Sequence, residues 1–306
     1  MRNFHVPSLG RAGISSTLKY LKDQGLSKET HIWVYDFEEE TYRENYPDMI
    51  LHVMNFPKNL TKKRNKLIDY IIEHGEPGIM LDDDISYFSI GKNQNGPLIK
   101  ITDFALIYDL FERAIKVCPE ISSLCCKRNF ITTFNAEPNN LFTKFSVPSA
   151  LIFFSGKPMK SRADEATKAD DICFVTECWL NKELSLKFNI IYINHTFGTN
   201  SGGLQSDYTD FKASTKQRLE EEHKFMVNKY DNESTYTINE KTGYFGSNGT
   251  KVRRWLLDTG KYTTEEMKTL ENTVKELSQR LYADEEFNKL LQSAYNSKHI
   301  LTKGEH

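Results

Sequence analysis

The chain has 306 residues, of which 39% are hydrophobic and 12% aromatic, so it has enough apolar material for a folded core and is not disordered throughout. Its net charge of −2 excludes a uniformly basic nucleic-acid coat but not a local basic groove. Because no run reaches the roughly 18 apolar residues of a membrane span and no apolar signal region opens the sequence, we expect a cytoplasmic protein.

Residues 1–85 alternate between strand-like and helix-like patterns. Apolar periodicity predicts strands at 4–7, 31–35, 49–53 and 78–81, helices at 14–21 and 61–73, and an acidic turn at 38–40. Strands separated by helices of this length favour a parallel, doubly wound sheet with right-handed crossovers. Ligands bind such sheets beyond the carboxyl ends of the strands, so we expect the chemistry at 8–13, at 35–37 and after Leu81.

The second half of the chain is less regular. Its patterns predict helices at 104–117 and 171–181, strands at 150–154 and 189–194, a Gly/Ser/Asn loop at 199–206 and a mixed polar segment at 214–255. A long helix begins after Thr263, where Glu266 completes a capping box. Its apolar positions extend over only two heptads, which favours packing against the body of the protein over a coiled coil.

Three consecutive carboxylates, Asp82, Asp83 and Asp84, follow the apolar strand 78–81. Their mutual repulsion raises their pKa values unless a cation neutralises them, and Mg²⁺ or Mn²⁺ commonly takes one or two carboxylates plus substrate phosphates. Strand alternation would point Asp82 and Asp84 to one side and Asp83 to the other. We therefore interpret the triplet as a metal clamp in which Asp84 binds the ion and Asp82 the same ion or the nucleotide's sugar. The alternative is an acidic surface turn.

Three motifs occur in order along the chain: VPSLGRA at 6–12, KRN at 63–65 and IMLDDDI at 79–85. Together they resemble GT-A nucleotide-sugar glycosyltransferases, and more narrowly the TET/JBP-associated glycosyltransferases of tailed bacteriophages, with a phage 5-hydroxymethylcytosine arabinosyltransferase as the nearest named relative. The resemblance covers about residues 1–200. It implies a GT-A-like α/β fold with a Rossmann-type mixed sheet and flanking helices over 1–210. Residues 211–306 would form a mixed polar segment and a C-terminal helical appendage that contacts the acceptor or DNA.

The resemblance also implies a metal-dependent, inverting enzyme. It would move arabinose or glucose from a UDP-sugar to a 5-hydroxymethylated pyrimidine in phage DNA, using Mn²⁺ or Mg²⁺, in the host cytoplasm. Two other functions remain open on the sequence: a GT-A glycosyltransferase that acts on a glycan, lipid or protein, and a Mg²⁺-dependent nucleotidyltransferase, which would release pyrophosphate instead of UDP.

The expected contacts to the nucleotide-sugar lie at strand ends and at the start of the helix 61–73. Backbone N–H groups and a guanidinium after the first strand can approach a base and a diphosphate. The sequence GRAG at 10–13 lacks the G-x-G-x-x-G pattern of a dinucleotide site. The basic residues at 62–66 have the alternative of a solvated helix start. The expected contacts are Pro7, Ser8, Arg11, Tyr35, Arg64, Asp82 and Asp83.

The pair Asp170-Asp171 is the candidate for the general base. An inverting transfer passes through an oxocarbenium-like transition state and needs a carboxylate that takes the proton of the acceptor hydroxyl. Asp171 is our first choice for this base and Asp170 the second, because the pair resembles the paired acid before a buried helix in inverting members of the fold. The alternative is a helix N-cap, a position where Asp is preferred.

His195 follows the strand 189–194 and stands where many GT-A enzymes place a late histidine metal ligand, although a histidine after a strand is often structural. DNA contact is expected at basic spots in 58–66, in 126–130 and in 251–254, where Trp255 could stack on a base. The alternative for all three spots is a solvated basic surface.

Overall fold

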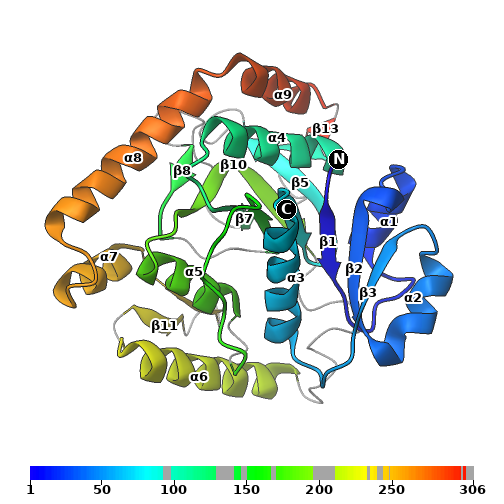
Figure 1. Cartoon of the computed structure of the whole chain (residues 1–306), viewed down its shortest axis with the longest axis horizontal. Coiled ribbons are helices and arrows are strands. Elements are labelled where there is room, and N and C mark those ends of the chain that lie inside the picture. Colours follow the sequence, from blue (N-terminus) through cyan, green and yellow to red (C-terminus); the bar gives the residue numbers. More distant parts are fainter. Residues whose placement is uncertain are drawn as a thin grey trace.

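The computed structural model describes residues 1–91, 98–128, 141–145, 150–166, 170–195, 211–232, 235–239, 244–247, 249–297 and 299–300. In this part of the chain a mixed sheet of 11 strands is flanked by helices on both faces (Figure 1). The predicted α/β architecture with a mixed sheet is therefore confirmed. Within the described residues, no helix is both long enough and apolar enough to cross a membrane.

The strands are β1 (Phe4–Pro7), β2 (Thr30–Tyr35), β3 (Ile50–Met54), β4 (Gly78–Leu81), β5 (Ile85–Gly91), β6 (Leu98–Ile101), β7 (Ser123–Arg128), β8 (Phe142–Thr143), β9 (Leu151–Phe154), β10 (Ser185–His195), β11 (Tyr236–Asn239), β12 (Tyr244–Ser247) and β13 (His299–Ile300). The α-helices are α1 (Ser16–Asp23), α2 (Glu39–Asn45), α3 (Leu60–His74), α4 (Phe104–Val117), α5 (Asp170–Leu180), α6 (Phe211–Tyr230), α7 (Gly249–Asp258), α8 (Thr264–Tyr282) and α9 (Glu285–Tyr295). Short 3₁₀ turns lie at η1 (Ser27–Glu29) and η2 (Asp36–Glu38).

The strand order in the main sheet is β13-β6-β5-β10-β7-β9-β4-β1-β2-β3, with β8 paired to β10. As expected, β1, β2, β3 and β4 are parallel. Beyond β4, the antiparallel strand β9 separates it from β7, which runs parallel to β10. The carboxyl ends of β1, β2, β4 and β10 therefore lie along one edge of the sheet.

Several elements differ from the sequence-based expectation. The acidic segment 38–40 is not a simple turn but joins η2 to α2, whose Tyr42 is buried against the sheet. The polar segment 214–255 holds most of α6 together with β11, β12 and most of α7. Helix α6 escaped the periodicity argument because its apolar residues do not gather on one face, although Met226 and Tyr230 are buried.

Successive residues of the strands face two separate cores. Phe4, Val6 and Leu81 belong to a cluster that α1, α4, α8 and α9 complete. Trp33 and Met80 belong to a second cluster, with residues of α3, α5, α6 and α7. Side chains just past the end of β4 can therefore point either toward the helices of the first core or toward those of the second.

The long C-terminal helix packs against the body of the protein, as expected. The capping box between Thr263 and Glu266 is present at the start of α8. Val274, Leu277 and Leu281 of α8 are buried in the larger core, and α9 packs on α4. Residues of 211–306 thus contribute to both cores, and β13 adds to the main sheet beside β6.

Two glycines with positive φ, Gly75 after α3 and Gly156 after β9, differ in the space around their Cα atoms. A Cβ at Gly156 (φ 75°) would lie 2.6 Å from the backbone of Glu76, whereas a Cβ at Gly75 (φ 66°) would meet nothing within 4 Å. Gly75→Ala should therefore cost only the local strain, about 1 kcal/mol. Gly156→Ala should cost at least about 3 kcal/mol, because the backbone must also move. Urea unfolding of the two variants measures the difference, and equal losses would contradict it.

Candidate active site at the carboxyl edge of the sheet

The candidate site lies where β1, β2 and β4 end and where α3 and α5 begin. Asp83 is the centre of a buried cluster at this edge. Ser8 Oγ and Arg11 Nη1 both donate to its carboxylate, and Ser15 Oγ donates to its backbone carbonyl over 2.7 Å. Burial raises the pKa of Asp83, and Arg11 opposes this rise. The carboxylate thus holds the loop after β1 in place, and Tyr42 Oη adds a bond of 2.6 Å to Ser8 Oγ.

Asp84 shares the guanidinium of Arg11 with Asp83, since Arg11 Nη1 lies 3.3 Å from Asp84 Oδ2. Burial and the neighbouring Asp82 raise the pKa of Asp84 to about 6. The expected alternation of the triplet was wrong: Asp83 and Asp84 both contact Arg11, whereas Asp82 contacts Arg64 instead. The reason is that β4 ends at Leu81 and the chain turns before β5 begins at Ile85.

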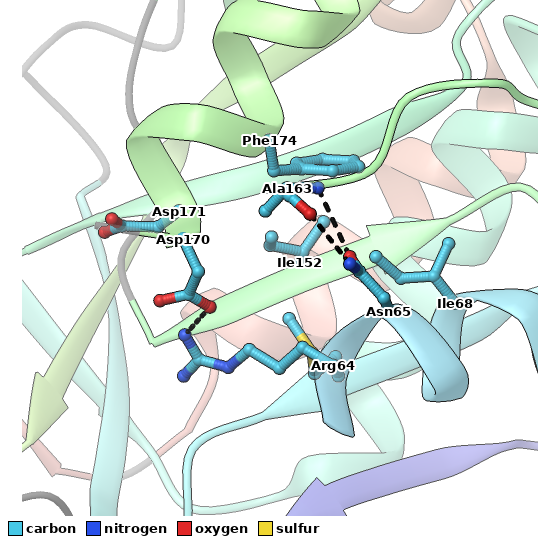
Figure 2. A pocket seen from close by; sticks show the side chains of 9 residues that line it. Arg64, Asn65, Ile68, Ile152, Ala163, Asp170, Asp171 and Phe174 are labelled. Atoms are coloured by element: carbon cyan, nitrogen blue, oxygen red, sulfur yellow. Dashed lines mark hydrogen bonds and ion pairs between the residues drawn. The ribbon is translucent and has the colours of Figure 1, made fainter. Parts of the chain in front are cut away.

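Arg64, near the start of α3, connects the triplet to the candidate base. Its Nη2 lies 2.6 Å from Asp82 Oδ1. Its Nη1 lies 2.5 Å from Asp170 Oδ2, and Figure 2 shows this second contact. Burial lowers the pKa of Arg64, but the carboxylates of Asp170 and Asp82 outweigh burial and hold the pKa above its ordinary value. One guanidinium therefore ties together two carboxylates for which the sequence suggested different roles.

Asp170 and Asp171 lie in the first turn of α5, where the helix dipole favours negative charge. The N-cap alternative places one of them before the helix, and neither occupies that position. Figure 2 shows Asp170 directed at Arg64 and Asp171 directed away from it, while Asp171 Oδ1 accepts a bond of 2.8 Å from Ile172 N. Reciprocal bonds between Asn65 and the backbone of Ala163 tie α3 to the described segment 150–166.

A small cavity of about 20 Å³ lies beside this acidic pair (Figure 2). Its polar lining comes from Arg64, Asn65, Asp170 and Asp171, and the rest is apolar. The volume is enough for about one water molecule. Asp170, which is 7% exposed, and Asp171 thus border this cavity from the first turn of α5.

The backbone of His195 lies at the same edge. It ends β10, and in the sheet it pairs with Ile85, the residue that follows Asp84. The side chain of His195 lies outside the described residues. Sheet topology thus brings this predicted ligand beside the triplet from a position 110 residues further along the chain, counted as 195 minus 85.

The donor chemistry of the triplet fits a hard divalent cation. Among the described residues, no three or more His, Cys, Asp or Glu side chains are already grouped so that they could hold a metal ion. Asp82 and Asp84 together supply the one or two carboxylates that Mg²⁺ or Mn²⁺ takes when substrate phosphates complete its shell. These two residues would hold the ion; Asp84 lies beside Arg11, and Asp82 lies beside Arg64.

The remaining predicted nucleotide contacts surround the loop after β1. Pro7 ends β1, and Tyr35 ends β2 with its hydroxyl accepting a bond of 2.8 Å from Asn59 N. Sequence reasoning missed Glu38, which is buried and accepts a bond from Gly10 N. Its place just beyond the end of β2 was the available signal, but the surrounding acidic run suggested a solvated turn.

The basic spots that were predicted to contact DNA differ in their exposure and contacts. The idea that Trp255 stacks on a base was wrong, because its side chain is 7% exposed and packs in the second core. Arg253 lies 3.0 Å from Glu271, and Arg254 is 84% exposed on α7. The side chains of 127–128, and residues 129–130 altogether, lie outside the described part of the chain.

Comparison with known proteins gives one family match. The model of the TET-associated glycosyltransferase family matches residues 3–196, which is more than half of the chain. A comparison with curated proteins finds no match.

The solved structures that are similar to parts of the chain include the following three. Protein A197 from STIV has 14% sequence identity and a TM-score of 0.34 over 64% of this chain and 86% of that chain. A mannose-1-phosphate geranyltransferase from Thermus thermophilus has 10% identity and a TM-score of 0.32 over 51% and 57% of the two chains. A Desulfovibrio desulfuricans protein described as a nucleotide-diphospho-sugar transferase has 11% identity and a TM-score of 0.33 over 61% and 80%.

Proposed function

Because the chain belongs to the TET-associated glycosyltransferase family, we propose that this glycosyltransferase moves a sugar from a UDP-sugar to a 5-hydroxymethylated pyrimidine in DNA. The observation that carries the proposal is the pairing of Asp82, Asp83 and Asp84 with two guanidinium groups, those of Arg11 and Arg64, at the edge of the mixed sheet where the parallel strands β1, β2 and β4 have their carboxyl ends. This is the edge at which α/β sheets bind nucleotides.

The donor would lie against the loop after β1. Arg11 and Arg64 supply positive charge for the diphosphate, and both already adjoin the carboxylates that would hold a cation. Asp84 and Asp82 would bind Mg²⁺ or Mn²⁺, whose charge stabilises the diphosphate as it leaves. Asp83 remains bound to Ser8 and Arg11 and so keeps the loop in shape.

The acceptor would approach from the side of α5. Asp171, which is directed away from Arg64, would accept the proton of the acceptor hydroxyl, and Asp170 would keep Arg64 in place. Attack opposite the leaving diphosphate inverts the anomeric centre. The transferred sugar, arabinose or glucose, and the DNA acceptor follow from the family resemblance, so they are tested first.

The decisive experiment incubates the protein with a panel of UDP-sugars and with duplex DNA that contains either cytosine or 5-hydroxymethylcytosine. Mass spectrometry of the digested nucleosides should find a hexose or pentose only on the hydroxymethylated base, with UDP as the second product. Transfer to a glycan, lipid or protein panel alone would exclude the DNA acceptor. Release of pyrophosphate would exclude glycosyl transfer and favour a nucleotidyltransferase.

Charge reversal on α7 tests the DNA contact separately from the donor site. Arg253→Glu with Arg254→Glu should weaken duplex binding and lower the slope of log K against log salt by up to about 0.9 per lost phosphate contact, while UDP affinity stays unchanged. Arg43→Glu on α2, where Arg43 pairs with Glu39, is the matched control. Unchanged duplex affinity across a salt series would show that this segment is a solvated surface that does not contact DNA.

A further inference from the structure

Lys63, in the first turn of α3, is fully buried, with 0% of its side chain exposed. A lysine is almost never buried to this degree without partners, because its charge loses the solvation of water. None of the described carboxylates forms an ion pair with its ammonium group. The neighbouring Arg64 is stabilised by two carboxylate partners. The burial of Lys63 therefore needs a different explanation.

The contacts of Lys63 lead to the loop after β1. Its Nζ donates to the carbonyl oxygen of Ser8 over 2.7 Å and lies 3.9 Å from the centre of the Tyr35 ring. Ser8 is the first residue past β1, so its carbonyl has left the strand ladder. A bond from a side chain replaces the ladder bond at this point.

Four bonds together fix Ser8. Its N–H donates to Trp33 O over 3.0 Å, and its carbonyl accepts from Lys63. Its hydroxyl donates to Asp83 and is also bonded to Tyr42 Oη over 2.6 Å. Two further residues of the same loop also make contacts: the N–H of Gly10 donates to Glu38, and Arg11 contacts the triplet. Losing the Lys63 bond would remove the side-chain anchor of the Ser8 carbonyl.

We propose that Lys63 is a positioning residue for the donor: its ammonium group orders the loop at 8–11 and couples the binding of an anionic nucleoside diphosphate to the uptake of a proton. The proposal rests on the proposed donor site. It does not require Lys63 to touch the donor, since the effect passes through the Ser8 carbonyl and through charge.

The electrostatics set the pH range of this coupling. Burial lowers the pKa of Lys63 to about 7, which places its titration in the neutral range. Glu38 from η2 and Asp83 from the turn after β4 raise this pKa, whereas Arg64 and Lys58 lower it, and the Tyr35 ring from β2 covers the ammonium. A bound diphosphate adds negative charge nearby and raises the pKa of Lys63.

Linkage then fixes the sign of both pH effects. The donor binds the protonated form better, so its affinity falls as pH rises from about 7 toward the pKa of the complex. Stability of the free protein changes in the opposite direction. Because the folded pKa lies below the unfolded one, the cost of the buried charge is complete below about pH 7. This cost is relieved as pH rises from about 7 to about 10.4.

The experiment measures UDP binding by titration calorimetry in Mg²⁺ at several values from about pH 7 to about pH 9. This range lies above the titration of Asp84, with its pKa of about 6, and above the second phosphate ionisation of about 6. In the wild type, the dissociation constant should rise by up to tenfold per pH unit. Buffers of different ionisation enthalpy should show proton uptake on binding. Lys66→Met removes an exposed lysine from the same helix, and it should keep this slope.

Lys63→Met should bind UDP more weakly at about pH 7 and with little dependence on pH, without proton uptake. Lys63→Gln, which keeps a donor but does not titrate, should also lose the dependence. A wild-type slope in either variant overturns the proposal. If the variants do not fold, absence of proton uptake by the wild type overturns it. If the wild type does not bind UDP at any pH, both the proposed donor and this inference are wrong. If it binds UDP but the dissociation constant does not change with pH, only this inference is wrong.

Discussion

Replacement of Asp84 by alanine should abolish sugar transfer and weaken UDP binding in the presence of Mn²⁺. The reason is that the diphosphate would lose a carboxylate that bridges to it through the cation. The fold should tolerate the change, because Arg11 keeps its ion pair with Asp83 and the substitution removes a buried carboxyl group whose pKa is already raised. The affinity for UDP is measured with and without Mn²⁺, so the result does not depend on turnover alone.

The controls separate metal binding from general damage. Asp48→Ala removes an exposed carboxylate elsewhere in the chain and should leave both readings at the wild-type level. EDTA should reduce wild-type activity to the level of Asp84→Ala. If the variant keeps near-normal activity, or if EDTA has no effect on the wild type, the metal hypothesis for the triplet is wrong.

Asp171→Asn should lower kcat by about 10²–10⁴-fold, the range that general-base catalysis supplies. The amide keeps the size of the side chain but does not accept the proton. UDP affinity should survive, because Arg11 and the triplet are unchanged. If Asp171 serves only the dipole of α5, the substitution should leave kcat intact and cost about 0.3–1 kcal/mol of stability.

Asp170→Asn provides the comparison within the same turn. It weakens the pair with Arg64, so we expect lower stability and a weaker donor site rather than a pure loss of kcat. Thermal unfolding and UDP titration accompany the kinetic measurement for both variants. A full-rate Asp171→Asn enzyme beside a folded but inactive Asp170→Asn enzyme would show that Asp170 is the base.

Much of the parallel half of the fold was predictable because its signals are local. The spacing of apolar residues and the turn at Gly75 placed β4 and α3 within a residue of their observed bounds. The same reasoning placed the triplet at the carboxyl edge of the sheet. Periodicity identifies such elements because each strand and helix there has its own alternating or amphipathic pattern.

What escaped prediction depends on contacts between distant segments. The bond from Arg64 to Asp170 joins residues 106 positions apart, and no local pattern announces it. The burial of Asp83 depends on where the chain turns after Leu81 and on Arg11, which contacts it from the loop after β1. For Lys63 the alternative of a solvated helix start was wrong, because α3 packs over β1 and its ammonium group lies buried against Ser8 and the Tyr35 ring.

The position of β10 has a consequence for the order in which the chain folds. Strands β5 and β6 pair with each other soon after synthesis, but β5 meets its other neighbour only when residues 185–195 have been made. A chain emerging from the ribosome can therefore complete β1 to β4, with the loop at 8–11, well before the sheet closes around β10. Because pairings between distant segments form slowly, insertion of β10 is the step we expect to limit folding, and the exposed edge of β5 the surface that a chaperone would protect meanwhile.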